Sequence, residues 1–328
     1  MDTPILERGS KGSAVADVQR RLVALGYTVD DPPGVFELAT ESALRSFQRQ
    51  RGLEPDGICG PETWSALVEA GWQLGDRLLY LRSPMLRGDD VADLQRRLAT
   101  LGFDPVRVDG IFGPDTEKAL REFQLNSGVT VDGVCGPETI RELRRLERRS
   151  AGTESVTVVR ERERLLNSDR TLANRRVSIA VPQGSDALAS AAARRLEQDH
   201  GAEVLTIVSS DPTHQCALAN EFGSELHLTI EPLVEPRCSC FYFESAGVPS
   251  PVGRRFAMNL ASRLEAVRCL AGPILVQGRT HRVLRETRMP AVLCRLGPSH
   301  VLVECNAEIA AAIGAAMASW SAQPVESS

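Results

Sequence analysis

A long internal repeat constrains this chain more than any other feature. The pattern from Gly12 to Leu67 recurs from Gly88 to Leu143 without a gap, at a constant offset of 76 residues. Both copies carry a glycine followed by an aromatic residue, then Phe-Gln, then Asp-Gly-x-Cys-Gly-Pro-Glu-Thr. A constant spacing of several motifs over such a distance is not expected by chance. The N-terminal part of the chain is therefore a duplicated structural module.

Each copy of the repeat predicts three helices. Apolar residues follow helical spacing in the first of them, at Val15, Val18, Leu22 and Leu25. Ser13 and its counterpart Asp89 suit the N-cap of that helix. The third helix is predicted to begin at Gly-Pro-Glu-Thr, because proline in the first turn loses no hydrogen bond. We expect two all-α three-helix modules, over residues 1–72 and 73–149.

The repeats resemble the peptidoglycan-binding module that accompanies bacterial cell-wall hydrolases. The second copy matches the family pattern throughout, including the segment 109–113, whereas the first has Pro33-Gly34-Val35-Phe36-Glu37 in that place. The resemblance implies six candidates for glycan contact: Asp109, Gly110, Phe112, Thr116, Asp132 and Gly133. Glycine and phenylalanine in this motif are expected mainly to build the bundle. Polar side chains on the turns are better suited to contact a ligand.

Three aromatic residues near the junction of the modules have two interpretations. Trp64, Trp72 and Tyr80 either pack between the modules or stack on a sugar ring. Packing is the interpretation we favour, and the alternative stays open.

An arginine-rich stretch follows the repeats. Residues 141–176 contain eleven arginines and six acidic residues, while the chain as a whole has a net charge of −5. The negative overall balance argues against a general nucleic-acid binder. We interpret residues 150–175 as a solvated, charged linker. A docking strip for an anionic partner or a membrane surface is the alternative, and it would place the protein near the membrane.

The pattern changes from residue 176, where strands and helices begin to alternate. We expect a sheet with helices on both faces, an α/β domain over 176–322 followed by a tail at 323–328. The predicted strands are 177–181, 203–208, 226–230, 240–243 and 291–296. The predicted helices are 188–196, 215–222, 256–267 and 308–320.

This domain resembles the zinc-dependent N-acetylmuramoyl-L-alanine amidase family. The resemblance rests on Gly201-Ala202-Glu203-Val204, on the segment from Ala217 to Ile230 and on Arg288-Met289-Pro290-Ala291-Val292-Leu293. With the two modules, the whole chain resembles amidase-like proteins of actinobacteria. Such an enzyme needs three zinc ligands and a catalytic carboxylate: the metal activates water and the carboxylate moves a proton.

The positions that carry this chemistry in the family are occupied by other residues here. The first histidine is replaced by Gln183, the third ligand by Glu231 and the catalytic glutamate by Arg295. The second ligand and its loop have no counterpart; Asp186 is the nearest carboxylate. An arginine cannot act as a base and repels Zn²⁺. We therefore predict a pseudoenzyme without a catalytic residue, metal or cofactor, with a Glu231–Arg295 ion pair in the former site.

The remaining features predict the compartment and partners. The first residues are not typical of a signal peptide, no stretch is apolar enough for a transmembrane segment, and the eight cysteines are scattered. We expect a cytoplasmic protein with reduced thiols. Its expected partners are peptidoglycan fragments or precursors and cell-wall synthesis proteins, and its expected function is to regulate peptidoglycan synthesis. The alternatives are an active zinc amidase with displaced ligands, and a protein scaffold whose repeats no longer bind glycan.

Overall fold

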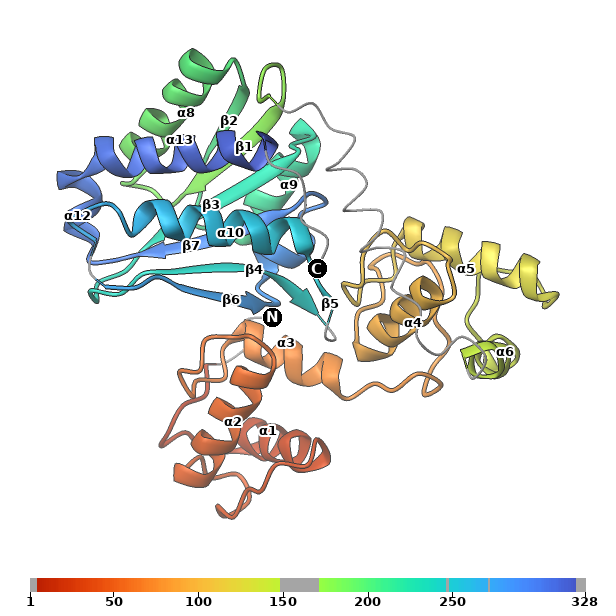
Figure 1. The fold of residues 1–328 in the computed structure, drawn as a ribbon. Coiled ribbons are helices and arrows are strands. Elements are labelled where there is room, and N and C mark those ends of the chain that lie inside the picture. The colour runs from red at the N-terminus through yellow and green to blue at the C-terminus, as the bar shows by residue number, and fades with distance from the viewer. Residues whose placement is uncertain (1–4, 148–170, 246–247, 271, 323–328) are drawn as a thin grey trace. The chain divides into compact units, whose positions relative to one another are not determined.

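The computed structural model describes residues 5–147, 171–245, 248–270 and 272–322 (Figure 1). The chain divides into two compact units, 1–157 and 158–328. The predicted linker lies mostly outside the described residues, and the predicted tail lies entirely outside them.

The first unit contains both repeats, and each has three helices. In the first repeat these are α1 (Ser13–Ala24), α2 (Leu38–Gln50) and α3 (Pro61–Ala70). In the second they are α4 (Asp89–Thr100), α5 (Pro114–Ser127) and α6 (Pro137–Glu147). The predicted three-helix modules are confirmed. The predicted N-caps are wrong by one residue: Gly12 and Gly88 hold the cap positions, and neither cap forms a side-chain hydrogen bond.

Each repeat has its own apolar core. Phe36 and Phe47 fill the first core, and Phe112 and Phe123 fill the second, all almost without exposed surface. The equivalent Cys59 and Cys135 are buried free thiols whose pKa burial raises to about 12. They are small core residues, as their sequence positions indicate, and not reactive nucleophiles.

The second unit is an α/β domain with a seven-stranded sheet. The strand order is β2-β1-β3-β7-β4-β5, and β6 also pairs with β4. The strands β1, β2, β3 and β7 are parallel, whereas β4 runs antiparallel to β7. The bounds are β1 Arg176–Val181, β2 Glu203–Val208, β3 Leu226–Pro232, β4 Ser239–Ser245, β5 Val248–Pro249, β6 Leu275–Arg279 and β7 Ala291–Leu296.

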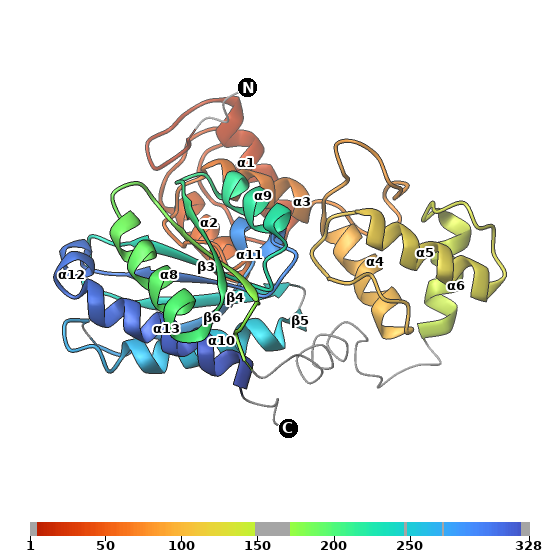
Figure 2. The same cartoon turned by 90° about the horizontal axis from the view of Figure 1, so that it is seen from above.

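Helices cover both faces of this sheet, as predicted. Figures 1 and 2 show α8 (Asp186–His200), α10 (Pro251–Leu264) and α13 (Asn306–Ala322) on one face, over the main core of the domain. The helices α9 (Pro212–Phe222) and α11 (Arg282–Glu286) lie on the other face (Figure 2). The sequence patterns miss β5, β6, α11 and α12 (Ser299–Glu304), which are among the shortest elements.

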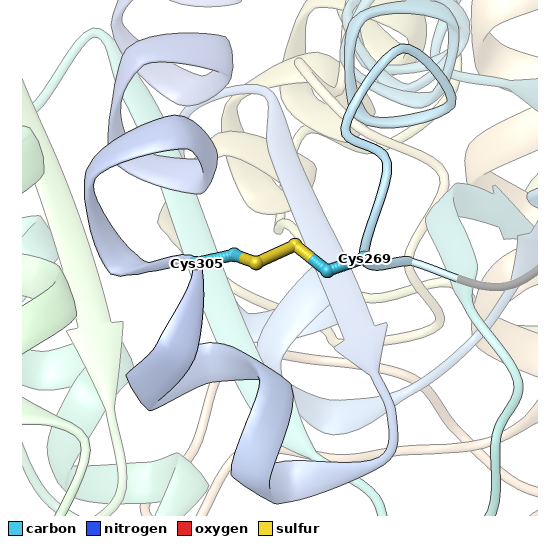
Figure 3. The surroundings of a disulfide bond; sticks show 2 residues. All are labelled: Cys269 and Cys305. Atoms are coloured by element: carbon cyan, nitrogen blue, oxygen red, sulfur yellow. A yellow bond between two sulfur atoms is a disulfide. The ribbon is translucent and has the colours of Figure 1, made fainter.

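The cysteines of the α/β domain are not all reduced. Cys269 is joined to Cys305 at the junction between α12 and α13 (Figure 3). The expectation of eight reduced thiols is therefore wrong for this pair. Their Cα atoms lie 6.6 Å apart, within bonding range, although 36 residues separate them in the sequence. Spacing alone could not reveal that approach. Within the described residues, no helix has the length and apolar character to cross a membrane.

Candidate functional sites in the repeats and the α/β domain

A buried glutamine organises the first Asp-Gly turn of the second repeat. The Oε1 of Gln95 accepts hydrogen bonds from the backbone N–H groups of Asp109 and Gly110, at 3.0 and 2.7 Å. Its Nε2 donates to Asp109 Oδ1, to the Ile111 carbonyl and to Thr116 Oγ1, at 2.9 to 3.0 Å. One side chain thus ties helix α4 to the turn and to the start of helix α5.

The second turn repeats this arrangement with Gln124. Its Oε1 accepts from the Gly133 N–H at 2.9 Å, and its Nε2 donates to Asp132, to the Val134 carbonyl and to Thr139. Gly133 has a φ of 73°, and a Cβ there would approach the Arg121 guanidinium to 2.8 Å. The backbone conformation therefore favours glycine, whereas the guanidinium is the end of a flexible side chain and could move aside.

These contacts place the six candidate glycan residues in two separate turns. Phe112 belongs to the core, and Thr116, Gly110 and Gly133 are buried. Asp109 is half-buried and Asp132 exposed, so of the six only these two residues keep appreciable solvent-exposed surface. The Val134 N–H, followed by the Gln124 amide, lowers the pKa of Asp132. All six residues serve the fold, and the two aspartates retain surface that a ligand can reach.

The first repeat builds its departing turn differently. Gln19 still accepts from the Gly34 N–H at 2.8 Å and donates to Thr40. Proline takes the place of Asp109 here. The Gln19 Nε2 therefore donates to no carboxylate, and its other acceptors are the backbone carbonyls of Pro32 and Val35. Asp31 supplies the missing carboxylate from another position, accepting N–H groups at the start of α2. The turn is preserved, but its carboxylate now comes from Asp31 and is engaged at the start of α2.

In the α/β domain, the predicted Glu231–Arg295 ion pair is confirmed. The two residues lie opposite each other near the carboxyl ends of the parallel strands β3 and β7. Arg295 Nε donates to Glu231 Oε2 at 2.8 Å, with side-chain exposures of 16% and 32%. The guanidinium also lies over the ring of Phe241, 5.7 Å from its centroid. Charge neutralisation and the apolar ring together hold Arg295 in place.

Gln183 and the nearby carboxylate of Asp186 both lie at the surface after β1. Gln183 is exposed in the turn after β1, and Asp186 opens helix α8, where it accepts the Gly184 N–H at 3.1 Å. The segment after β3 is short and lies against Gly297, where a Cβ would come within 2.1 Å of the Glu235 carbonyl oxygen. Backbone therefore occupies space beside the ends of β3 and β7.

A buried polar network lies on the same face of the sheet as Glu231, further back along β3. His227 is fully buried; its Nδ1 lies 2.8 Å from Ser178 Oγ and its Nε2 3.0 Å from Thr229 Oγ1. Ser224 and Gln215 continue the network at its two ends. Burial lowers the pKa of His227 to about 4, so the imidazole is neutral near pH 7. Period-two spacing in the sequence places His227, Thr229 and Glu231 on one face of β3, which is the only sequence signal for this network.

Comparison with known proteins agrees with both halves of this structure. Residues 11–67 and 87–143 each match the family described as putative peptidoglycan binding domain. The N-acetylmuramoyl-L-alanine amidase CwlM of Mycobacterium tuberculosis is 34% identical over 90% of this chain and 82% of its own length. The chain belongs to the CwlM family.

Two further similarities are more partial. The amidase CwlL of Bacillus licheniformis is 32% identical over 38% of this chain and 41% of its own length. The structure of an N-acetylmuramoyl-L-alanine amidase from Clostridium difficile 630 covers 45% of the chain at 16% identity, with a TM-score of 0.37. As a member of the CwlM family, the chain combines peptidoglycan-binding repeats with an amidase-like α/β domain.

The residues of this CwlM-family chain do not fit the zinc of the amidases it resembles. Gln183 offers an amide where an imidazole is required, and Glu231 is engaged with Arg295. Among the described residues, no group of three or more histidine, cysteine, aspartate or glutamate side chains is arranged to hold a metal. A single carboxylate gives little affinity without two or three further ligands.

Proposed function

We propose that this chain binds peptidoglycan fragments or precursors without cleaving them, and that it regulates cell-wall synthesis through protein partners. The Glu231–Arg295 ion pair carries the proposal. It occupies the place where the amidase pattern has a zinc ligand and the catalytic glutamate. A self-neutralised pair at that place favours a binding protein over a hydrolase.

The chemistry of amide hydrolysis explains why. A base must take a proton from the attacking water, but a guanidinium stays protonated and can only donate hydrogen bonds. Glu231 accepts a charge-assisted hydrogen bond from Arg295, so its carboxylate is already engaged by a cation. Neither residue is suited to activate water or to hold a cation beside the other.

The peptidoglycan part of the proposal is supported by the repeats. Both match the family model, and the second has the complete pattern, with a half-buried Asp109 and an exposed Asp132 in its two turns. Because proline takes the place of Asp109 in the first repeat, we expect binding to depend mainly on the second. The partner proteins are proposed from the expected loss of catalysis: a chain that does not cleave its ligand can act by carrying it or by contacting other proteins.

An active amidase with displaced ligands is the second candidate. It is favoured by the names of the relatives, several of which are described as N-acetylmuramoyl-L-alanine amidases. A protein scaffold without glycan binding is the third. Zinc content separates the amidase from the other two, and glycan binding separates our proposal from the scaffold.

The test is elemental analysis of full-length protein purified without chelator, combined with hydrolysis of a muropeptide. We expect well below one zinc per chain and no cleavage of the muramoyl–alanine amide. The variant Arg295→Glu, which restores the carboxylate, should also be inactive, because the helix-start ligand and its loop are still missing. About one zinc per chain with zinc-dependent cleavage by the unaltered protein would make the amidase the better assignment.

A further inference from the structure

The second repeat has an exposed apolar loop that the first repeat lacks. The segment before α4 crosses both Asp-Gly turns, because Leu79 pairs with Cys135 and Arg87 pairs with Ile111. Between these two bridges, residues 80–85 read Tyr-Leu-Arg-Ser-Pro-Met, and all six are exposed. We call this segment the 80–85 loop.

Apolar side chains make up much of the surface of the 80–85 loop. Tyr80, Leu81 and Met85 are 40%, 37% and 46% exposed, and the neighbouring Leu78 is 53% exposed. The Met85 sulfur lies beside Gly113 and a Leu78 methyl beside Gly136, the glycines that precede helices α5 and α6. The apolar surface therefore adjoins both turns that carry Asp109 and Asp132.

The equivalent segment of the first repeat is shorter and polar. Its bridges join Leu6 to Cys59 and Lys11 to Val35, so three fewer residues lie between them. The intervening sequence is Glu-Arg-Gly-Ser, and the Ser10 hydroxyl accepts the Glu7 N–H at 3.1 Å to close a compact turn. The shared fold does not need the 80–85 loop, since the first repeat is complete without it.

Tyr80 is suited to stacking in a way that the neighbouring Trp72 is not. The guanidinium of Arg77 covers the Trp72 ring at 4.5 Å from its centroid and is fixed by the buried Asp90 at 2.7 Å. Within the described part of the chain, no ring or guanidinium contact involves Tyr80. Its ring is thus an exposed aromatic surface with the adjacent aliphatic side chains around it.

We propose that the 80–85 loop contacts the sugar backbone of peptidoglycan, with Tyr80 stacked on a sugar ring. This inference rests on the proposed function, because it assumes that the second repeat binds peptidoglycan. The C–H face of a pyranose is apolar and matches an aromatic ring, while the methyl groups of N-acetyl and lactyl substituents match Leu81 and Met85. The stem peptide carries carboxylates, and Arg82 on the same loop supplies the complementary charge.

A sugar chain fits this surface better than a protein partner. The apolar part comprises only four side chains, whereas a stable protein interface needs about 800 Å² from each partner. A narrow saccharide strand needs far less, and the turns adjoining the loop carry Asp109 and Asp132, whose carboxylates can accept hydrogen bonds from sugar hydroxyls. These features select a polar, hydroxyl-rich ligand with apolar faces.

The experiment measures binding of full-length protein to isolated peptidoglycan by sedimentation, and to a soluble disaccharide-peptide by calorimetry. Tyr80→Ala should weaken binding about tenfold, a loss typical of truncating one central aromatic contact. Tyr80→Phe should recover most of that loss, because the ring and not the hydroxyl makes the stacking contact. Glu7→Ala, in the equivalent loop of the first repeat, is the matched control and should leave binding unchanged.

The two possible failures are distinguishable. If the unaltered protein binds peptidoglycan and Tyr80→Ala binds equally well, the role of the 80–85 loop is overturned while the proposed function stands. If the unaltered protein does not bind either probe, both are overturned. Because Tyr80 is exposed, each variant should keep the helical circular dichroism of the parent; a variant with equal helicity and weaker binding supports the assignment.

Discussion

The repeats and the α/β domain differ in how closely they match the motifs of the families they resemble. In the repeats, Gln95 and Gln124 each use their buried amide to hold an Asp-Gly turn against two helices. In the α/β domain, the positions that the resemblance to the amidase family assigns to its catalytic groups hold an exposed Gln183 and the Glu231–Arg295 pair. By that assignment, the chain matches one motif nearly throughout and departs from the other.

The difference follows from what each motif does for the fold. Loss of Gln124 would leave the buried Gly133 N–H without its partner, and a buried unpaired polar group is costly; the Val134 carbonyl would keep only its contact with Thr139. Gln183 lies in an exposed turn beyond the end of β1, where its identity affects no core contact. A motif required for stability constrains its residues even without a ligand, whereas catalytic groups at strand ends constrain theirs only through function.

The α/β domain has its own stability-bearing polar network, away from the former catalytic edge. His227 forms hydrogen bonds with Ser178 and Thr229 on the buried sheet, much as Gln124 forms hydrogen bonds with its turn in the repeat. The comparison therefore predicts that stability depends on these buried networks in both units, and much less on the ion pair at the strand ends.

The largest expected effect concerns His227 and pH. Its pKa is about 4 in the folded state, below the ordinary value of 6.5. Well above pH 6.5 the imidazole is neutral in both the folded and the unfolded state. As the pH falls toward 4, His227 becomes protonated in the unfolded chain but stays mostly neutral in the folded chain. The α/β domain should therefore lose up to about 3 kcal/mol of stability between pH 6.5 and 4.

This loss is measured by urea unfolding of the full-length protein at a series of pH values. Because carboxylates also titrate in this range, the informative quantity is the difference between variants. His227→Gln should flatten the pH dependence, while His214→Gln, at an exposed histidine, should keep it. An identical pH dependence in both variants would show that His227 is not the group responsible.

The next effect tests the repeat side of the comparison. Gln124→Leu keeps a similar side-chain volume but removes every hydrogen bond that Gln124 makes to the turn. It should lower the free energy of unfolding by about 2–3 kcal/mol. Leu125→Ala on the same helix is the control; that leucine is 70% exposed, so its loss should stay within about 0.5 kcal/mol. Equal unfolding midpoints for the two variants would mean that the turn does not need its glutamine.

How much the sequence predicts also differs between the two regions. Internal repetition located the helices of the repeats, and alternating patterns located the longer strands of the α/β domain. The Glu231–Arg295 pair was predictable because the resemblance to the amidase family places these two residues in one site, at the ends of two strands. The Cys269–Cys305 bond, the strand β6 and the His227 network were not, since each depends on contacts between distant segments that no local pattern records.

The role of the candidate aspartates illustrates the same limit. A pattern match does not distinguish a ligand contact from a turn contact, and in the structure Asp109 and Asp132 both make turn contacts. The equivalence of the repeats offers a way to separate them. Asp56 in the first repeat accepts the Gln48 amide and the Ile58 N–H at 2.8 Å each, just as Asp132 accepts Gln124 and Val134.

The smallest expected effect is therefore the most selective. Asp56→Ala and Asp132→Ala each remove two equivalent hydrogen bonds made by an exposed aspartate. Each should lower the free energy of unfolding by about 0.5–1 kcal/mol, measured by thermal or urea unfolding. If the second repeat provides the ligand surface, only Asp132→Ala, and more strongly its combination with Asp109→Ala, should weaken binding to isolated peptidoglycan. Equal binding losses from Asp56→Ala would assign the glycan to both repeats. Unchanged binding in the Asp109→Ala/Asp132→Ala variant would leave these aspartates a purely structural role.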